Sequence, residues 1–586
     1  MYIVKLHRKE YDKTRVKLRL ARVFYIGRNK REMEKLKPKL FSVMKTYTKE
    51  QLIKDIIAGV IVAIIALPLS IALALASGVT PEKGIYTAII AGFLISFFGG
   101  SRVQISGPTA AFATIVAGIV AKQGMEGLIV ATILAGIILI LMGLLKFGSM
   151  IKFIPYTITT GFTAGIAVTI VVGQMKSYLG LTTDPSVNAI ETVEKIEEVI
   201  RHIDTINWSA VVVGIVSSII LWICPKLPGA LKKIPGSLVA VVVGILMVKG
   251  LQMEVKTIGD LYTITSELPK FHFPAISFAT VKNVLPDAFT IAILAAIESL
   301  LSCVVADSMV NSKHRSNMEL VAQGIGNVGS ALFGGIPATG AIARTAANVK
   351  NGGRTPIAGM VHAVVLLLIL VVFMPFAGMI PMPTIAAILF MVAYNMSEWR
   401  HFVHLLKTAP KSDIIVLVLT FVLTVMFDLV VAISVGIVLA AMLFMKRMSE
   451  VTEVDSWKYI DDENDPYSID LKVVPKNAVV YEISGPLFFG AADKILDIKL
   501  KEKYDVLILR MRSVTALDAT AMHFLEQFYE KCEKKGIVLV LSHVNEQPMH
   551  TMKKAGFDKM IGEENFCAHI DDALMRAEEI IESNLN

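Results

Sequence analysis

Residues 335–344 read GIPATGAIAR, an apolar run that glycine, proline and threonine interrupt and that ends at Arg344. A helix cannot run cleanly from Gly335 to Gly340, because proline lacks a backbone N–H and glycine frees the backbone. A short helix that begins near Ala338 would leave its first N–H groups unpaired and its positive dipole end open. Such a helix end attracts anions, so this stretch is predicted to bind one.

Residues 104–112 read QISGPTAAF, a second broken stretch that also opens a short apolar helix. Paired interrupted helices at corresponding places in two halves of a chain are typical of the midplane site of a transporter. The alternative is that both breaks are ordinary packing kinks. Because the two breaks occupy matching positions, the sequence favours an anion carrier.

The composition is that of a membrane protein. Of the 586 residues, 54% are hydrophobic, and several runs of transmembrane length carry almost no charge. The formal net charge of +8 is concentrated in residues 1–51 and in short loops, which indicates membrane orientation rather than a nucleic-acid partner. The basic first fifty residues are expected to be a cytosolic arm attracted to the anionic headgroups of membrane lipids. The four cysteines lack metal-ligand spacing or a disulfide framework. We expect no cofactor and no metal site.

Fourteen apolar spans are predicted, at residues 53–77, 84–100, 106–121, 127–147, 153–178, 207–224, 234–250, 284–306, 318–333, 337–349, 356–377, 381–396, 412–427 and 428–446. If the N-terminus is cytosolic, the even-numbered connections should be basic, and they are. The sequence therefore predicts a multi-pass protein of the cell membrane with both termini cytosolic.

Seven spans precede the polar connection and seven follow it, so the second half must enter the membrane inverted. The broken spans are the third of each half, and their helix starts should converge at mid-membrane. The predicted division is a basic cytosolic region (1–50), a first transmembrane repeat (51–250), a connection (251–283), a second repeat (284–446), a linker (447–466) and a cytosolic domain (467–586).

The last segment has a different character, because strand-like and amphipathic runs alternate in it. Strands are expected at residues 478–483, 506–510 and 537–541, and amphipathic segments at 491–501, 520–534 and 549–554. This alternation predicts a small α/β domain.

Four motifs together resemble the SulP family of sulfate-permease-type anion transporters, which carry a C-terminal STAS domain. They are ISGPTAAF (105–112), AIESLLS (296–302), FGGIPATGAIARTA (333–346) and LDATA (517–521). The resemblance implies fourteen spans in two intertwined inverted repeats, a mobile core domain that carries the site, a gate domain, elevator-like alternating access and a homodimer.

The resemblance also implies an anion site at two helix starts. Backbone N–H groups there would bind the anion away from competing water. Arg344, one turn into the second helix, would add a bidentate donor, although a snorkelling arginine at a helix end is the alternative. The predicted substrate-binding residues are then Thr109, Ala110, Ala111, Ala338, Thr339, Gly340, Ala341 and Arg344, together with Pro68 and Leu69 of the first span.

Glu298 is an acidic residue inside an otherwise apolar span, and a charged carboxylate there costs several kcal/mol. Proton uptake by Glu298 on each cycle would remove that cost, with Ser302 one turn further along. Sodium-coupled bicarbonate members of the family have an aspartate in the matching place, so sodium coupling is the alternative. A purely structural carboxylate, paired with Arg344 or hydrogen-bonded, is the third reading.

Two further places carry over from the family. Pro68 should break the first span, in the region that closes over the substrate, and Leu69 stands where many members have glutamine. In the STAS domain, Asp518 and Thr520 match the corner where relatives carry a phosphorylatable hydroxyl. Thr520 is also a good helix N-cap residue, which is the simpler explanation. A cytosolic partner of this domain is a further expectation.

The predicted function is secondary active transport of sulfate, a dicarboxylate or bicarbonate, by proton symport. Anion exchange or sodium-coupled bicarbonate transport is the alternative within the class. The alternative from another class is a membrane anchor or sensor that signals through its STAS domain. An ATP-driven pump and an enzyme are disfavoured, because neither a phosphate-binding loop nor a catalytic set of residues is present.

Overall fold

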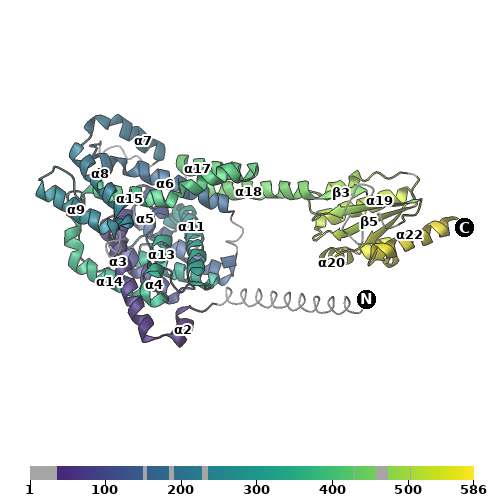
Figure 1. The fold of residues 1–586 in the computed structure, drawn as a ribbon, viewed down its shortest axis with the longest axis horizontal. Helices are drawn as coiled ribbons and strands as arrows, with labels where there is room; N and C mark the ends of the chain where they lie inside the picture. Colours follow the sequence, from purple (N-terminus) through teal and green to yellow (C-terminus); the bar gives the residue numbers. More distant parts are fainter. Residues whose placement is uncertain are drawn as a thin grey trace. The chain divides into compact units, whose positions relative to one another are not determined.

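The computed structural model describes residues 36–149, 155–183, 191–227, 235–427, 429–456, 473–501 and 503–585. The chain divides into two compact units, Met1–Ile437 and Val438–Asn586, and the boundary falls within one helix (Figure 1). Most of the predicted basic region and part of the predicted linker, residues 1–35 and 457–466, lie outside the described residues.

The first unit is helical, and a helix lies at each of the fourteen expected spans, the last of which continues into the second unit. In chain order its helices are α2 (Leu40–Val43), α3 (Lys49–Ala76), α4 (Pro81–Phe98), α5 (Ala110–Leu144), α6 (Tyr156–Leu179), α7 (Thr192–Arg201), α8 (Trp208–Ile223), α9 (Gly236–Gly250), α10 (Ile258–Leu261), α11 (Phe278–Val310), α12 (Ser316–Leu332), α13 (Ile342–Lys350), α14 (Pro356–Ala377), α15 (Met382–Ser397), α16 (Trp399–Thr408), α17 (Lys411–Met426) and α18 (Leu429–Val451).

Two of the expected spans lie within α5, which bends at Gly124 (φ 70°). Among the described residues, seven helices are long and apolar enough to cross a membrane by themselves. The remaining helices are shorter, so the number of crossings stays a prediction. The polytopic helical class agrees with the prediction.

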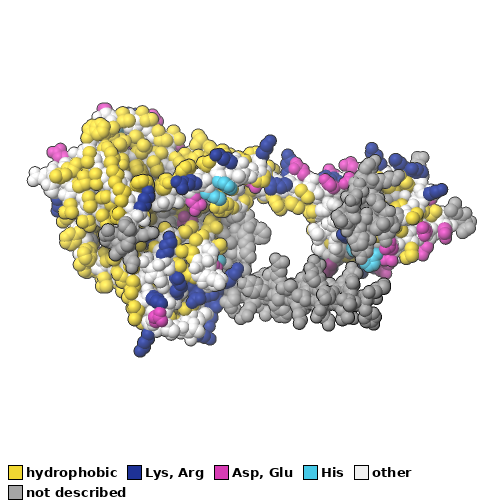
Figure 2. Space-filling view, viewed as in Figure 1, with side chains coloured by type: hydrophobic (Ala, Val, Ile, Leu, Met, Phe, Trp, Pro, Cys, Tyr) yellow, Lys and Arg dark blue, Asp and Glu magenta, His cyan; other side chains and the backbone are white. Residues whose placement is uncertain are grey.

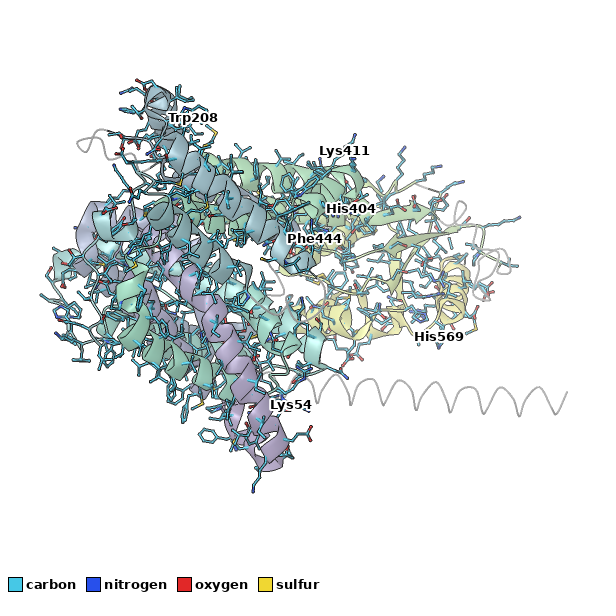
Figure 3. The ribbon with its side chains drawn as sticks, turned by 60° about the vertical axis from the view of Figure 1, so that its left-hand side comes forward. Lys54, Trp208, His404, Lys411, Phe444 and His569 are labelled. Atoms are coloured by element: carbon cyan, nitrogen blue, oxygen red, sulfur yellow. The ribbon has the colours of Figure 1, made fainter. Side chains whose placement is uncertain are left out.

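Large apolar side chains cover much of the outer surface of this unit (Figure 2). On α8, exposed residues include Trp208 and Trp222, and on α14 they include Leu368 and Phe373. An apolar surface of this extent requires lipid or another apolar cover. Figure 3 labels Lys54 on α3 and Trp208 on α8 at opposite ends of the unit, as expected if these two helices begin on opposite sides of a membrane.

The helices of this unit pack as two sets. In one set, α12 packs against α4 and α5, α14 packs against α3 and α4, and α11 packs against α5. In the other, α15 packs against α6 and α8, and α17 packs against α6. In the predicted repeat, α6 and α8 of the first half correspond to α15 and α17 of the second half. The α6–α17 contact and the α15–α8 contact are then equivalent, because each becomes the other when the two halves are exchanged. An inverted repeat has this symmetry of contacts.

The expected break at Pro68 is wrong, because α3 runs unbroken from Lys49 to Ala76 with Pro68 inside it. Proline removes one N–H donor from the helix ladder, and packing can hold such a helix together. Here α4 lies close against α3 at Ser70, since a Cβ on Gly84 would meet the Ser70 carbonyl. Pro68 is therefore accommodated within a continuous, tightly packed helix.

The second unit is an α/β domain around a five-stranded sheet. The strands are β3 (Glu453–Ser456), β4 (Ala478–Ser484), β5 (Val506–Ser513), β6 (Val538–Ser542) and β7 (Phe566–Cys567), in the order β3-β4-β5-β6-β7. The β3–β4 pair is antiparallel and the other pairs are parallel. Its helices are α19 (Ala519–Lys534), α20 (Glu546–Ala555), α21 (Phe557–Ile561) and α22 (Ile570–Leu585).

Three strands and two helices of this domain agree with the sequence prediction. The amphipathic segment at residues 491–501 is different, because only a short 3-10 helix (Ala492–Asp497) forms there. The sequence reading also missed α22, which buries Leu574 and Ala577 against one face of the sheet. The opposite face is covered by a second cluster that contains Phe528 and Cys532 of α19.

Cys532 illustrates how well this second cluster excludes water. Burial raises the pKa of the Cys532 thiol to about 12. At pH 8 the thiolate is then about ten-thousandfold less abundant than the thiol. We expect N-ethylmaleimide to leave Cys532 unmodified in the native protein and to modify it after denaturation in detergent, as peptide mass spectrometry would show. Equal modification in both states would contradict this packing.

Candidate anion site

The two broken stretches meet in the interior of the helical unit. Ser106–Gly107 forms the short strand β1 and Thr339–Gly340 forms β2, and they pair antiparallel, with Ser106 opposite Gly340 and Gly107 opposite Thr339. The helices that follow, α5 and α13, therefore start next to one another. The predicted convergence of the two breaks is present in the structure.

Each helix start presents backbone donors. Thr109 is the N-cap of α5 and Ala341 is the N-cap of α13, and neither side chain caps its helix. The N–H groups of a first turn have no acceptor within their own helix. Ala110 and Ala111 of α5 and Ile342 and Ala343 of α13 occupy these positions, so their N–H groups are the donors available to an anion.

The predicted start of the second helix near Ala338 is wrong by four residues. The Ala338 N–H donates to Asn327 Oδ1 (2.8 Å), and the Ala341 N–H donates to the Ile105 carbonyl (2.9 Å). The cause is the pairing of the two breaks, which holds the chain extended through Gly340. The donor positions at this helix start are therefore Ile342 and Ala343, which the sequence reading did not name.

Arg344 lies in the first turn of α13 and is 3% exposed. Its Nη2 donates a hydrogen bond to the Pro108 carbonyl, just before α5 begins. Its Nη1 is buried and has no hydrogen-bond partner in the described part of the chain. A buried guanidinium with an unpaired N–H is costly, and an anion between the two helix starts would relieve that cost.

Gly107 makes room for this guanidinium, because a Cβ at Gly107 would collide with Arg344 Nη1. We expect Gly107→Ala to displace Arg344 and to reduce anion uptake at least about tenfold, the effect of losing ~1.4 kcal/mol of binding. Gly118→Ala is the matched control, since a Cβ at Gly118 has nothing within 4 Å. Uptake by Gly107→Ala equal to that of the control would contradict this role.

Glu298 of α11 connects to the first helix start. Thr109 Oγ1 donates to Glu298 Oε2 at 2.8 Å, and Thr339 Oγ1 donates to the Ala295 carbonyl of the same helix at 3.1 Å. Within the described residues no ion pair joins Glu298 to Arg344, although the two charges interact. Ser302, one turn along α11, is buried and its hydroxyl has no partner in the same part of the chain.

Pro68 and Leu69 lie on α3, which contacts both α5 and α13. Their part in the anion site stays a prediction. One side of the site is formed by extended backbone, at Ala338, Thr339, Gly340 and Ala341. Thr109, Ala110, Ala111, Arg344 and Glu298 are brought together.

A buried polar network behind the breaks was missed in the sequence reading. Glu319 of α12 accepts from the backbone N–H of Gly100 (2.9 Å) and from the side chains of Gln104 (2.9 Å) and Gln323 (2.9 Å). The Asn327 side chain hydrogen-bonds both backbone groups of Ala338: its Oδ1 accepts from the Ala338 N–H, and its Nδ2 donates to the Ala338 carbonyl. The spacing of Glu319, Gln323 and Asn327, four residues apart, places them on one helix face and is the signal that could have revealed them.

His362 of α14 was also missed. It is fully buried, and neither ring nitrogen has a hydrogen-bond partner among the described residues. Its ring lies close enough to Arg344 for their charges to interact. A single histidine in the apolar run 356–377 was the available signal. In the part of the chain that the structure describes, no group of three His, Cys, Asp or Glu side chains is placed to hold a metal ion.

Comparison with known proteins finds one family for the helical unit and one domain type for the α/β unit. Residues 52–420 match the profile of the "Sulfate permease family", and residues 468–573 match that of the "STAS domain". The "Putative sulfate transporter YvdB" of Bacillus subtilis is 39% identical over 540 residues, which cover 90% of this chain and 98% of that protein.

Two solved structures resemble the chain. The transmembrane domain of the cyanobacterial bicarbonate transporter BicA is 30% identical, with a TM-score of 0.59 over 67% of this chain and 98% of that one. The murine Solute Carrier 26 family member A9 anion transporter has a TM-score of 0.83 at 18% identity, over 93% of this chain and 94% of that one. The second likeness is one of fold.

Proposed function

Because this chain belongs to the sulfate permease family of membrane anion transporters and ends in a STAS domain, we propose that it carries a small oxyanion across the cell membrane by proton symport. The observation that carries the proposal is the unpaired, buried Nη1 of Arg344 beside two uncapped helix starts. Donors from both halves of the chain converge there. The site suits a sulfate, bicarbonate or carboxylate group, whose oxygens can accept from several N–H groups at once.

The proposed coupling residue is Glu298. Its carboxylate lies within an apolar helix and accepts a hydrogen bond from Thr109, the residue that starts the anion-binding helix. A proton on Glu298 would neutralise a negative charge near an incoming anion, so proton and anion binding would favour each other. Two alternatives to proton symport remain. One is sodium coupling with Ser302 as a sodium ligand, and the other is anion exchange without proton or sodium coupling.

The order of candidate substrates is a carboxylate or sulfate first and bicarbonate second. The relatives are named for sulfate and bicarbonate. Leu69 in place of a glutamine removes a polar group from the region that closes over the substrate in relatives. This difference favours testing several anions rather than one.

The proposed transport movement is an elevator. The set of helices that contains α5, α11 and α13 carries the whole site and would move against the set that contains α6, α8 and α15. We also propose the seven-plus-seven division at residues 51–250 and 284–446, cytosolic termini, and a homodimer. The sensor function is disfavoured, because an anchor has no need to place between two helix starts a buried arginine whose Nη1 lacks a partner among the described residues.

The test is radiotracer uptake into proteoliposomes that hold the purified full chain. Sulfate, bicarbonate, succinate and fumarate are compared with and without an inward proton gradient, and then with a sodium gradient or internal chloride. We expect the proton gradient to accelerate uptake of one of these anions. Stimulation by sodium alone, or by internal anion alone, would replace proton symport with the corresponding alternative, and no uptake under any gradient would favour the sensor.

The STAS domain offers a regulatory site in this proposal. Asp518, and not Thr520, is the N-cap of α19, because its Oδ1 accepts from the Ala521 N–H at 2.8 Å and its Oδ2 accepts from the Phe489 N–H at 2.9 Å. Thr520 is exposed in the first turn, where a phosphate would meet the positive helix end. Mass spectrometry of the protein from cells grown under several conditions tests this, and unmodified Thr520 throughout would count against it.

A further inference from the structure

The short helix α16 lies between α15 and α17 and has a distinct arrangement of side chains. Glu398, in a left-handed conformation (φ 41°), turns the chain sharply from α15 into α16. The apolar side of α16 packs inward, with the Phe402 ring 5.3 Å from the Phe421 ring of α17. His401 packs edge-on against Tyr156 at the start of α6, with ring centroids 5.2 Å apart.

A cavity of about 350 Å³ opens at this junction. Its lining consists of Tyr156 of α6, Tyr394 and Asn395 of α15, the junction residue Glu398, and Trp399, Arg400 and His401 of α16. The Nε2 atom of His401 is buried and has no hydrogen-bond partner in the described part of the chain. The charged groups that the lining presents are the exposed side chains of Arg400 and Glu398.

Charge and aromatic character identify the ligand. Arg400 and His401 are followed along the chain by further basic residues, His404, Lys407 and Lys411, of which Figure 3 labels the first and the last. The acidic residues nearby are Glu398 and Asp413. Tyr156, Tyr394 and Trp399 are each about half exposed.

Exposed tyrosine and tryptophan side chains at the end of apolar helices lie at the level of lipid headgroups. Basic side chains at the cytosolic end of such helices attract anionic lipids. The connection that contains α16 is one of the basic connections that the topology prediction places in the cytosol. Both features point to the inner surface of a membrane.

We propose that this cavity binds the headgroup of an anionic phospholipid. The lipid phosphate would accept from the Arg400 guanidinium, while the acyl chains lie along the exposed aromatic side chains. This site is separate from the anion site between α5 and α13. The lipid would hold α6, α15 and α17 together at one end of the second set of helices.

The experiment is native mass spectrometry of the full chain released from detergent with phosphatidylglycerol or with phosphatidylcholine of the same acyl chains. Arg400→Gln is the test variant and His401→Gln is the second. Lys407→Gln is the matched control, because it removes one positive charge from the same helix but does not line the cavity. Gel filtration confirms that each variant is folded and records its oligomeric state. A parallel sample with inorganic phosphate at equal concentration distinguishes a lipid from a free phosphate.

We expect phosphatidylglycerol to be retained in preference to phosphatidylcholine. Arg400→Gln should weaken its retention about fivefold, the effect of one basic side chain at an anionic surface, and Lys407→Gln should weaken it less. Equal weakening by both variants would overturn the proposal in favour of general surface attraction. Displacement of the lipid by inorganic phosphate would overturn it in favour of a free-anion site. If a second copy of the chain fills the cavity in a dimer, only the monomer should bind lipid. That result would also overturn the proposal.

Discussion

Arg344→Gln is expected to reduce uptake of the transported anion at least a hundredfold. The substitution removes a charge and the donors that face the space between the two helix starts, each charge-assisted hydrogen bond contributing about 1.5–3 kcal/mol. The measurement is initial uptake into proteoliposomes that contain equal amounts of folded protein. Arg344→Lys should fall between the wild type and Arg344→Gln, because an ammonium keeps the charge but loses the planar fork.

The control for this variant is Lys350→Gln, which removes the same charge from the exposed end of the same helix. Stability supplies a second readout. Since Arg344 Nη2 also donates to the buried Pro108 carbonyl, its removal should lower the melting temperature of the substrate-free protein, and uptake is therefore compared at equal amounts of folded protein. Full uptake by Arg344→Gln would show that the guanidinium has a packing role and does not hold the anion.

Glu298→Gln is expected to abolish accumulation driven by a proton gradient while leaving exchange of labelled for unlabelled anion. An amide resembles the protonated acid but cannot release a proton, so the loaded carrier can still move in both directions. With one proton per anion, a gradient of one pH unit drives up to about tenfold accumulation, and the variant should show none. Uptake to equilibrium, with and without the gradient, measures both properties.

Glu126→Gln is the control, because Glu126 is an exposed carboxylate of the same unit, 3.1 Å from His272. Accumulation by Glu298→Gln equal to that of this control would remove Glu298 from the coupling mechanism. Loss of exchange as well as accumulation would show that the carboxylate is needed for the transport movement itself.

The helix breaks in the third and tenth spans could be predicted from the sequence, because glycine and proline weaken a helix through local backbone effects. Arg344 and Glu298 could be identified in the same way, because charges in apolar runs are rare. The exact start of α13 could not be predicted. The start of α13 depends on the pairing of residues 339–340 with residues 106–107. Local helix propensity contains no information about a pairing partner so distant in the chain. Pro68 failed as a helix breaker for a similar reason, because packing against α4 supports the helix.

The pairing of β1 with β2 has a consequence for how the protein is made. Pro108 and Arg344, which meet through a hydrogen bond, are 236 positions apart in the chain. The ribosome therefore synthesises the first helix start long before the second. Until the second half is inserted, the backbone donors of the first helix start lack the groups that complete the anion site. Two co-expressed fragments, divided in the connection at residues 251–277, should reconstitute transport, whereas neither fragment alone should bind the anion.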